Sequence, residues 1–435
     1  MDFTPSARSR EYLERVQEFM RTEIEPVEAA LLAALGDRDG RTAGREGDGG
    51  IAGREGDGGI AGRDGGGGAD PWTVPPRIRD LQRKARAAGL WNLFMPDETY
   101  GVGLSNVEYA PLAEAMGRSA IAPVVFNCAA PDTGNIEVFY HYGSEEQRNR
   151  WMVPLLEGRI RSAFCMTEPD VASSDATNMA ATAVLDGDEV VLNGRKWWST
   201  GVGHPDCDVL VFMGVTDPTA HRYLRHSMVA VPRDTPGVRV ERMLPTMGFY
   251  DEPGGHGEVS FTDVRLPASA IIAGPGRGFE IAQGRLGPGR VHHCMRLIGL
   301  AERALELACR RGVSRTAFGK PLVNLGGNRE RIADARIAIQ QARLLVLHTA
   351  WLLDTDGIGA ALSAVSQIKV AVPTMAQQVV DMAIQLHGGA GLSNDLPLAG
   401  AWTTARAIRL ADGPDEVHRG VVARLELAPY LEEAR

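Results

Sequence analysis

The sequence predicts an α+β protein of several domains, in which a helical segment, a β-rich segment and a second helical segment follow one another. Apolar residues recur at helical spacing up to about residue 160 and again after Gly278. Between them lie β-branched runs separated by turn dipeptides. Because strands and helices do not alternate, a Rossmann sheet is not expected. We place the three domains at residues 1–160, 161–273 and 274–435.

The bulk composition is that of a soluble globular protein. A chain of 435 residues is too long for one core, and its 44% hydrophobic and 23% charged residues match ordinary globular usage. The net charge of −9 argues against a broad nucleic-acid footprint. Apolar runs fall short of the roughly 20 residues that a membrane helix requires. We therefore expect neither a nucleic acid nor a membrane as a partner.

The five cysteines indicate a reducing compartment. Their number is odd and none forms a Cys-x-x-Cys pair, which fits a cytoplasmic protein better than a disulfide framework. The N-terminus lacks the charged and apolar regions of a signal peptide, so we expect a cytoplasmic location. We expect Cys165 to be a buried small hydrophobe. No His, Cys and carboxylate cluster has zinc spacing, and the adjacent His292 and His293 cannot share a helix face, so no metal site is predicted.

The N-terminal segment combines a helix with a repeat. Tyr12, Val16, Phe19 and Ile24 recur at helical spacing. A nine-residue glycine-rich unit then occurs twice between residues 43 and 60, and a third copy begins at Ala61. Its residue order differs from that of calcium-binding β-rolls, and so few copies cannot bury a solenoid core. We predict a flexible, dispensable surface insertion at residues 36–70.

The middle segment carries strand and hairpin signals. Asp186-Gly187 and Asn193-Gly194 are both strong turn dipeptides, and they bracket the β-branched run from residue 189 to 192. Three further apolar runs are expected to be strands: residues 209–212, 228–231 and 258–261.

The C-terminal segment returns to the helical period. One long helix is expected through Ile332 and Leu352, and another through Val370 and Leu386. The glycine pair at 388–389 should end the second helix.

Five motifs occur in a family's order and at its spacing. They are Gly143-Ser144-Glu145-Glu146-Gln147, Cys165-Met166-Thr167-Glu168-Pro169, Arg315-Thr316-Ala317-Phe318-Gly319, Gln385-Leu386-His387-Gly388-Gly389 and Leu410-Ala411-Asp412-Gly413-Pro414. Together they resemble the acyl-CoA dehydrogenase family of flavoproteins, and the resemblance covers nearly the whole chain except the repeat. It implies an all-α N-terminal domain, a central β-barrel and a C-terminal four-helix bundle.

The resemblance makes Asp412 the catalytic base. Most of the family has Glu at this place and uses it to remove the substrate α-proton, while a hydride passes to FAD. A carboxylate with a pKa of about 4 is a poor base for this proton unless burial raises its pKa and donors stabilise the enolate-like charge. Asp is shorter than Glu by ~1.5 Å, so the backbone or the substrate must come closer. Some relatives carry the base at the position of Gly289. The nearby Asp415 and Glu416 are alternatives.

The resemblance implies flavin contacts on the β-rich segment. A flavin that accepts hydride develops negative charge on its pyrimidine side, which fixed donors stabilise. The implied residues are Phe164, Met166, Thr167, Ser173, Trp198, Ser199 and Thr200. The substrate-contacting serine is either Ser173 or Ser174, because the loop has an apparent extra residue. The alternatives are a turn cluster for the loop and core packing for the tryptophan, and Trp197 is expected to pack.

Further FAD contacts are implied in the C-terminal segment. Arg315 resembles an arginine that reaches the FAD pyrophosphate of a neighbouring subunit, and a guanidinium suits a phosphate better than an ammonium does. A surface helix arginine is the alternative. The other implied residues are Phe318, Gln385, Gly388, Gly389, Pro414, Asp415 and Glu416. The resemblance therefore implies a homodimer or homotetramer with FAD at the subunit interface.

The implied substrate is an acyl-CoA thioester, and the implied electron acceptor is an electron-transferring flavoprotein. The residues expected to contact the substrate are Ser174, Gly287, Gly289, Arg290 and Gly413. The closest motif match is to a branch whose animal relatives also carry a kinase-like domain and act on long or branched acyl-CoAs. The alternatives are a nitroalkane-oxidase-like flavin oxidase, which also uses an Asp base, and a non-catalytic relative associated with nucleic acid.

Overall fold

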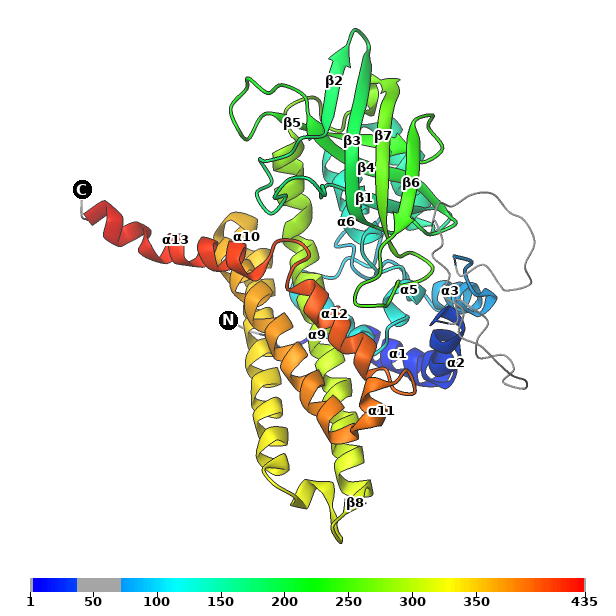
Figure 1. The fold of residues 1–435 in the computed structure, drawn as a ribbon, viewed down its shortest axis with the longest axis vertical. Coiled ribbons are helices and arrows are strands. Elements are labelled where there is room, and N and C mark those ends of the chain that lie inside the picture. Colours follow the sequence, from blue (N-terminus) through cyan, green and yellow to red (C-terminus); the bar gives the residue numbers. More distant parts are fainter. Residues whose placement is uncertain (1–2, 37–71, 434–435) are drawn as a thin grey trace, which may run out of the picture. The chain divides into compact units, whose positions relative to one another are not determined.

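The computed structural model describes residues 3–36 and 72–433, and their elements follow the predicted order of helices, strands and helices (Figure 1). The glycine-rich repeat predicted at residues 36–70 lies outside the described residues, apart from Gly36 at the end of a helix.

The first helical segment is built of short helices. Ser105 and Ser144 begin two of them, each closing a capping box with the Glu or Gln three residues later. The elements are α1 (Ala7–Phe19), the π-helical η1 (Met20–Ile24), α2 (Glu25–Gly36), α3 (Pro76–Ala87), α4 (Asn106–Gly117), α5 (Ala122–Val125), α6 (Asp132–Tyr142), α7 (Glu145–Gln147), the π-helical η2 (Arg148–Met152) and α8 (Val153–Leu156).

The predicted barrel domain is a curled sheet of seven strands. The order is β1-β4-β2-β3-β7-β6, and β5 pairs with β4. Its strands are β1 (Arg161–Cys165), β2 (Thr182–Asp186), β3 (Glu189–Thr200), β4 (Cys207–Val215), β5 (His226–Pro232), β6 (Val238–Met243) and β7 (His256–Pro267). Apolar side chains from these strands form one core, in which the rings of Phe212 and Phe261 lie 4.6 Å apart. The strands predicted at 209–212, 228–231 and 258–261 lie within β4, β5 and β7.

One of the two predicted hairpin turns is wrong. Asp186-Gly187 does join β2 to β3, but Asn193-Gly194 lies inside β3. The pairing of β3 with β7 shifts register between Leu192 and Gly194, and Gly194 has φ +141°. A side chain at Gly194 would meet Ala181 at 2.5 Å. The glycine therefore serves a bulge with a close neighbour rather than a turn.

The second helical segment begins with the 3-10 turn η3 (Ala268–Ala270) and continues with α9 (Gly278–Ser314), the short strands β8 (Thr316–Ala317) and β9 (Lys320–Pro321), η4 (Leu322–Asn324), α10 (Asn328–His387), α11 (Gly389–Leu392), α12 (Leu398–Ile408) and α13 (Asp415–Glu433). The two predicted long helices are the two limbs of α10, which Gly357 separates with φ 77° and ψ 178°. Gly388, with φ +64°, ends the second limb as predicted.

Among the described residues, α10 is the one helix whose length and composition would allow it to cross a membrane. Half of its apolar window is buried inside the protein. Core helices of soluble proteins have the same composition, so this feature alone is weak support for a membrane segment.

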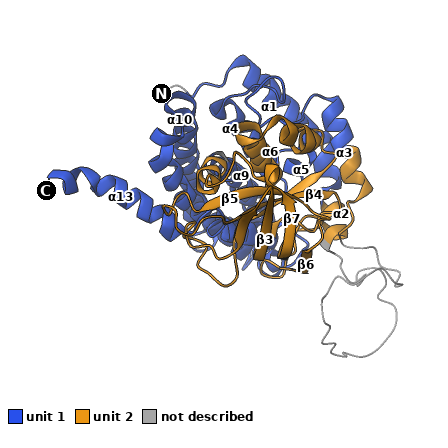
Figure 2. Cartoon of the chain, turned by 90° about the horizontal axis from the view of Figure 1, so that it is seen from above, with its two compact units in different colours: residues 1–28, 81–128, 286–435 blue, residues 29–80, 129–285 orange. Residues whose placement is uncertain are grey.

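The chain forms two compact units (Figure 2). Unit 1 contains residues 1–28, 81–128 and 286–435, and unit 2 contains residues 29–80 and 129–285. In unit 1, α4 approaches α9 so closely that a side chain at Gly117 would meet the carbonyl oxygen of Arg296 at 2.0 Å. In unit 2, Asp132 at the start of α6 accepts hydrogen bonds from the main-chain N–H and the hydroxyl of Ser162 in β1.

Candidate active site

Asp412 lies in the turn between α12 and α13 and has a left-handed backbone, with φ +56°. Asp is one of the few residues with a side chain that adopt this conformation readily. Its carbonyl oxygen accepts a hydrogen bond from Arg290 Nε at 2.9 Å and contacts His418 Nε2 at 3.2 Å. Gly413 follows with φ +101°, and a side chain there would meet the His418 ring at 2.9 Å. The turn is therefore held by contacts that other side chains make with its main-chain atoms.

Two further contacts fix the same turn within unit 1. Lys369, which is fully buried on α10, donates to the carbonyl oxygens of Ile408 at 2.5 Å and Gly413 at 3.2 Å. Arg409 forms an ion pair of 2.7 Å with the buried Asp415. Since the carboxylate of Asp415 is committed to this pair, it is a weaker candidate for the base than Asp412.

Burial changes the pKa of the basic groups around the turn. Desolvation lowers the pKa of Arg290 and of Lys369, and the charge of Asp412 opposes both changes. Desolvation, with Arg290 and Lys369 adding to it, lowers the pKa of His418 to about 4. His418 is therefore neutral at neutral pH, and we place its proton on Nε2 because Asp412 offers an acceptor there.

The Asp412 side chain is partly buried and contacts a histidine. Its Oδ2 lies 3.6 Å from His293 Nε2, and 22% and 21% of the two side chains are exposed. Arg296 donates to His293 Nδ1 at 3.2 Å, which leaves the ring proton of neutral His293 on Nε2, facing the carboxylate. From the sequence, His292 and His293 are a poor metal pair and at least one is expected to be a polar contact or a core histidine, but the contact between His293 and Asp412 is not predicted. The adjacent His292 is buried against Tyr109, and desolvation lowers its pKa to about 3.

Three of the predicted substrate residues lie on α9, and one of them, Arg290, contacts the turn at Asp412. The run from Gly287 to Arg290 belongs to the interior of α9. Gly287 is buried, and a side chain there would meet Ile358. At Gly289 nothing lies within 4 Å of the place that a side chain would take. The position at which some relatives carry a base is thus open space here.

The loop that follows β1 is anchored by a buried ion pair in unit 2. Lys196 Nζ lies 2.7 Å from Glu168 Oε1 and also donates to the carbonyl oxygen of Met166 at 3.0 Å. Glu168 accepts from the main-chain N–H groups of Ala180 and Ala181. The pair fixes the main chain on both sides of Thr167, whose side chain is partly buried.

The two candidate serines of this loop differ in their surroundings. Ser173 Oγ accepts a hydrogen bond of 2.9 Å from the main-chain N–H of Glu168, as the turn-cluster interpretation expects. Ser174 is exposed. Phe164 lies in β1, and the Arg285 guanidinium stacks on its ring at 3.8 Å.

The end of β3 presents aromatic and polar groups that suit a flavin. Its pairing with β7 shifts register between Lys196 and Ser199, and Trp198 in this bulge has φ +51° and is 39% exposed. The indole N–H of Trp197 is buried and has no hydrogen-bond partner within the described part of the chain. An exposed aromatic face and an unsatisfied donor fit a polar, planar ring system. Ser199 is buried, and Thr200 is partly buried and contacts His256.

Most of the residues predicted to bind the rest of FAD are exposed in unit 1, although Asp415 is buried. Arg315 precedes the β8–β9 hairpin, and Phe318 at its tip is 95% exposed. Gln385, Gly388 and Gly389 are exposed at the end of α10, and nothing lies within 4 Å of a side chain placed on either glycine. Pro414 is partly buried and Glu416 is exposed. Such exposed groups can bind a ligand that is shared with another molecule.

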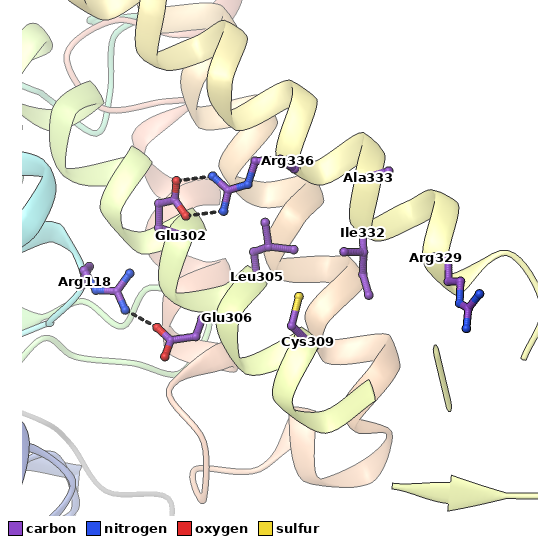
Figure 3. Close-up of a pocket in the computed structure, with 9 residues that line it drawn as sticks. All are labelled: Arg118, Glu302, Leu305, Glu306, Cys309, Arg329, Ile332, Ala333 and Arg336. Carbon is purple, nitrogen blue, oxygen red and sulfur yellow. Dashed lines mark hydrogen bonds and ion pairs between the residues drawn. The ribbon is translucent and has the colours of Figure 1, made fainter. Parts of the chain in front are cut away.

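A separate hollow of about 620 Å³ in unit 1 contains none of the predicted site residues (Figure 3). Glu302 and Glu306 line it and are paired with Arg336 and Arg118. Among the described residues, no group of three or more His, Cys, Asp and Glu side chains could hold a metal ion.

Comparison with known proteins identifies the family. The acyl-CoA dehydrogenase N-terminal, middle and C-terminal domain models match residues 69–159, 163–264 and 276–427. The chain belongs to the acyl-CoA dehydrogenase family.

Individual relatives agree with this assignment. The chain is 47% identical over 98% of its length to a Mycobacterium tuberculosis protein named probable acyl-CoA dehydrogenase FadE2, of which it covers 97%. A solved structure of a candidate acyl-CoA dehydrogenase from Mycobacterium abscessus is 71% identical, with a TM-score of 0.90 over 98% of this chain and 100% of that one. Mouse acyl-CoA dehydrogenase family member 10 is 58% identical over 82% of this chain. The chain spans only 34% of that mouse protein, and about half of related animal and plant proteins.

Proposed function

We propose that the protein catalyses the FAD-dependent α,β-dehydrogenation of a fatty acyl-CoA thioester, with Asp412 as the base that removes the α-proton. Family membership supports the reaction class. The observation that carries the assignment of the base is the turn at Asp412. Its main chain is held by Arg290, Lys369 and His418, while its side chain stays partly exposed.

The chain's own residues would bind, orient and deprotonate the substrate. The Asp412 carboxylate takes the α-proton, and His293 Nε2 lies 3.6 Å from its Oδ2. Ser174, Gly287, Gly289, Arg290 and Gly413 would border the thioester arm. Bound FAD supplies the acceptor for the hydride that leaves the β-carbon. Because an aspartate reaches less far than a glutamate, the main chain must bring it to the substrate, which the contacts to the Asp412 carbonyl support.

We assign FAD binding to two groups of residues. Phe164, Met166, Thr167, Ser173 and the run from Trp198 to Thr200 would border the flavin. Arg315, Phe318, Gln385, Gly388, Gly389, Pro414, Asp415 and Glu416 would contact the remainder of FAD. The exposure of Phe318 and Arg315 supports a cofactor shared between subunits of a homodimer or homotetramer. The reduced cofactor would pass its electrons to an electron-transferring flavoprotein. Five free cysteines support a cytoplasmic location.

Anaerobic titration of the purified yellow protein with a panel of acyl-CoAs tests the proposal. We expect the flavin absorbance to bleach with at least one acyl-CoA and to return when an electron acceptor is added. A colourless protein that refuses FAD would refute the proposal. Bleaching by a nitroalkane, followed by rapid oxygen consumption, would instead identify a flavin oxidase with the same base.

A further inference from the structure

Three polar side chains in unit 2 are joined by hydrogen bonds that lead from the end of β3 to solvent. Thr200, the last residue of β3, and His256, the first residue of β7, are opposite one another across the two strands. Thr200 Oγ1 lies 2.9 Å from His256 Nδ1, and His256 Nε2 lies 3.0 Å from Asp251 Oδ2. The His256 side chain is 18% exposed and the Asp251 side chain 61%. The hydroxyl is thus connected to solvent by two hydrogen bonds.

The partners of His256 fix the direction of both hydrogen bonds. An ionised carboxylate only accepts, so His256 Nε2 carries a proton that it donates to Asp251. In a neutral ring, Nδ1 is then an acceptor, and the Thr200 hydroxyl donates to it. Only the lone pairs of Thr200 Oγ1 remain for another partner. When the ring is protonated, Nδ1–H donates to Thr200, and the hydroxyl hydrogen becomes free to be donated elsewhere.

We infer that His256, held by Asp251, sets whether Thr200 accepts or donates a hydrogen bond toward the flavin ring. The inference rests on the proposed function, in which Thr200 borders the flavin. An oxidised flavin edge offers acceptors, whereas reduction adds an N–H donor. A protonated His256 therefore suits the oxidised ring and a neutral His256 suits the reduced ring. His256 and Asp251 act through Thr200 and are positioning residues.

The arginines near the Thr200–His256–Asp251 hydrogen bonds are paired with another carboxylate. Arg195 on β3 and Arg242 on β6, the strands packed against β7, are both paired with the buried Glu258. Within the loop before β7, Glu252 adjoins Asp251 in sequence and has further interactions of its own. Trp198 packs against the His256 ring, with the centroids 5.7 Å apart. The exposed Asp251 can exchange the ring proton with water.

The test is the flavin midpoint potential of the FAD-loaded protein, measured against pH for the wild type and His256→Gln. Glutamine keeps a hydrogen-bonding side chain but does not titrate. We expect the difference between the two potential curves to change with pH, because only the wild type has a side chain at this position that can gain a proton. His221→Gln, which removes an exposed imidazole in another loop of unit 2, is the matched control and should give a curve parallel to the wild type.

Nitrogen NMR of His256 gives an independent readout that needs no turnover. At one pH, the protonated fraction of His256 should be higher in the oxidised protein than in the reduced one, and Thr200→Val should abolish this difference. Parallel potential curves for wild type and His256→Gln, or identical His256 spectra in both redox states, would overturn the inference and leave the proposed function intact. A protein that binds no flavin would refute both.

Discussion

At the scale of single residues, the backbone conformation of position 412 favours an aspartate there. The left-handed φ of +56° suits Asp better than a longer side chain, and three donors hold the surrounding carbonyls. Asp415 and His418 are tied into the same turn. The main chain of Asp412 is therefore held by contacts that do not involve its own side chain.

We expect Asp412→Asn to keep its bound FAD and its fold but to lose turnover by roughly 10²- to 10⁴-fold, the usual contribution of a general base. The amide is close in size and cannot take the α-proton. Stopped-flow measurement of anaerobic flavin bleaching checks this expectation. The exposed Asp395→Asn is a suitable control. Bleaching at the wild-type rate in Asp412→Asn would move the base to another residue.

His293 should act by orienting the Asp412 carboxylate. Because His293 Nε2 lies 3.6 Å from Asp412 Oδ2, losing this contact in His293→Ala should lower kcat by about 10-fold at most and change KM little. His293→Gln, whose amide N–H can also donate, should recover part of the loss. The α-deuterium isotope effect on bleaching should grow in His293→Ala. A rise in KM at unchanged kcat would instead assign His293 to substrate binding.

Glu137 should make the stability of the fold depend on pH. Desolvation raises the pKa of this buried carboxyl to about 8, although Arg285 opposes the change, and its Oε2 has no hydrogen-bond partner in the described residues. Between the ordinary pKa of Glu and about 8, the folded protein binds more protons than the unfolded chain. Stability therefore falls as pH rises through this window, by at most about 1.4 kcal/mol per pH unit.

Urea unfolding at several pH values tests this linkage. We expect Glu137→Gln, which resembles the neutral carboxyl, to lose less stability than the wild type between pH 5 and pH 8. The exposed Glu146→Gln should follow the wild type. Equal pH profiles for wild type and Glu137→Gln would show that Glu137 ionises normally.

At the scale of elements, the buried Lys196–Glu168 pair connects β3 to the loop after β1. Lys196→Met leaves the Glu168 carboxylate buried without its cation, which typically costs 3–5 kcal/mol. We expect a loss of this order in urea unfolding and a smaller loss when Glu168→Gln is added. Arg159→Met, which breaks an exposed ion pair, should cost at most about 1 kcal/mol. An unchanged stability of Lys196→Met would mean that the loop is held by other contacts.

Elements with strong local signals could be predicted from the sequence. The Asp186-Gly187 turn, the runs within β3, β4, β5 and β7 and the Gly388 cap each follow from a few neighbouring residues, whereas β1, β2 and β6 are not predicted as strands. Asn193-Gly194 has the same local signal as a turn, but its close approach to Ala181 is a tertiary contact that the dipeptide does not encode. The two limbs of α10 were separated correctly because the helical pattern itself is interrupted near Gly357.

The candidate site is divided in the same way between residues that local motifs mark and residues that only tertiary contacts bring together. Asp412 and Arg290, both named from motifs, contact one another, whereas His293, Arg296 and Lys369 lie around them without any motif that marks them. Lys369 did leave a signal, since it is a single cation within the apolar run Ile368-Lys369-Val370-Ala371-Val372. His256 and Asp251 left none, because their relation to Thr200 depends on strand pairing between distant segments.

At the scale of the whole molecule, the exposed Arg315 and Phe318 should couple FAD retention to assembly. We expect Arg315→Ala to weaken FAD binding by roughly 10- to 100-fold, the value of a charge-assisted hydrogen bond to phosphate, without changing the stability of the fold. Equilibrium dialysis with FAD, alongside the oligomeric state by sedimentation, checks this. Arg310→Ala, which alters a neighbouring exposed arginine on α9, should retain FAD normally. Normal FAD binding by Arg315→Ala, or by an isolated monomer, would contradict a shared cofactor.

Arg290 and His418 contact the carbonyl oxygen of Asp412 and not its side chain, which determines how substitutions at this position affect the turn. Arg290, His418 and Lys369 contact atoms that every amino acid possesses. A mutation at position 412 therefore keeps these contacts, and the new residue has only to accept the left-handed backbone at this position. Asn, which adopts that conformation readily, should disturb the turn less than Glu.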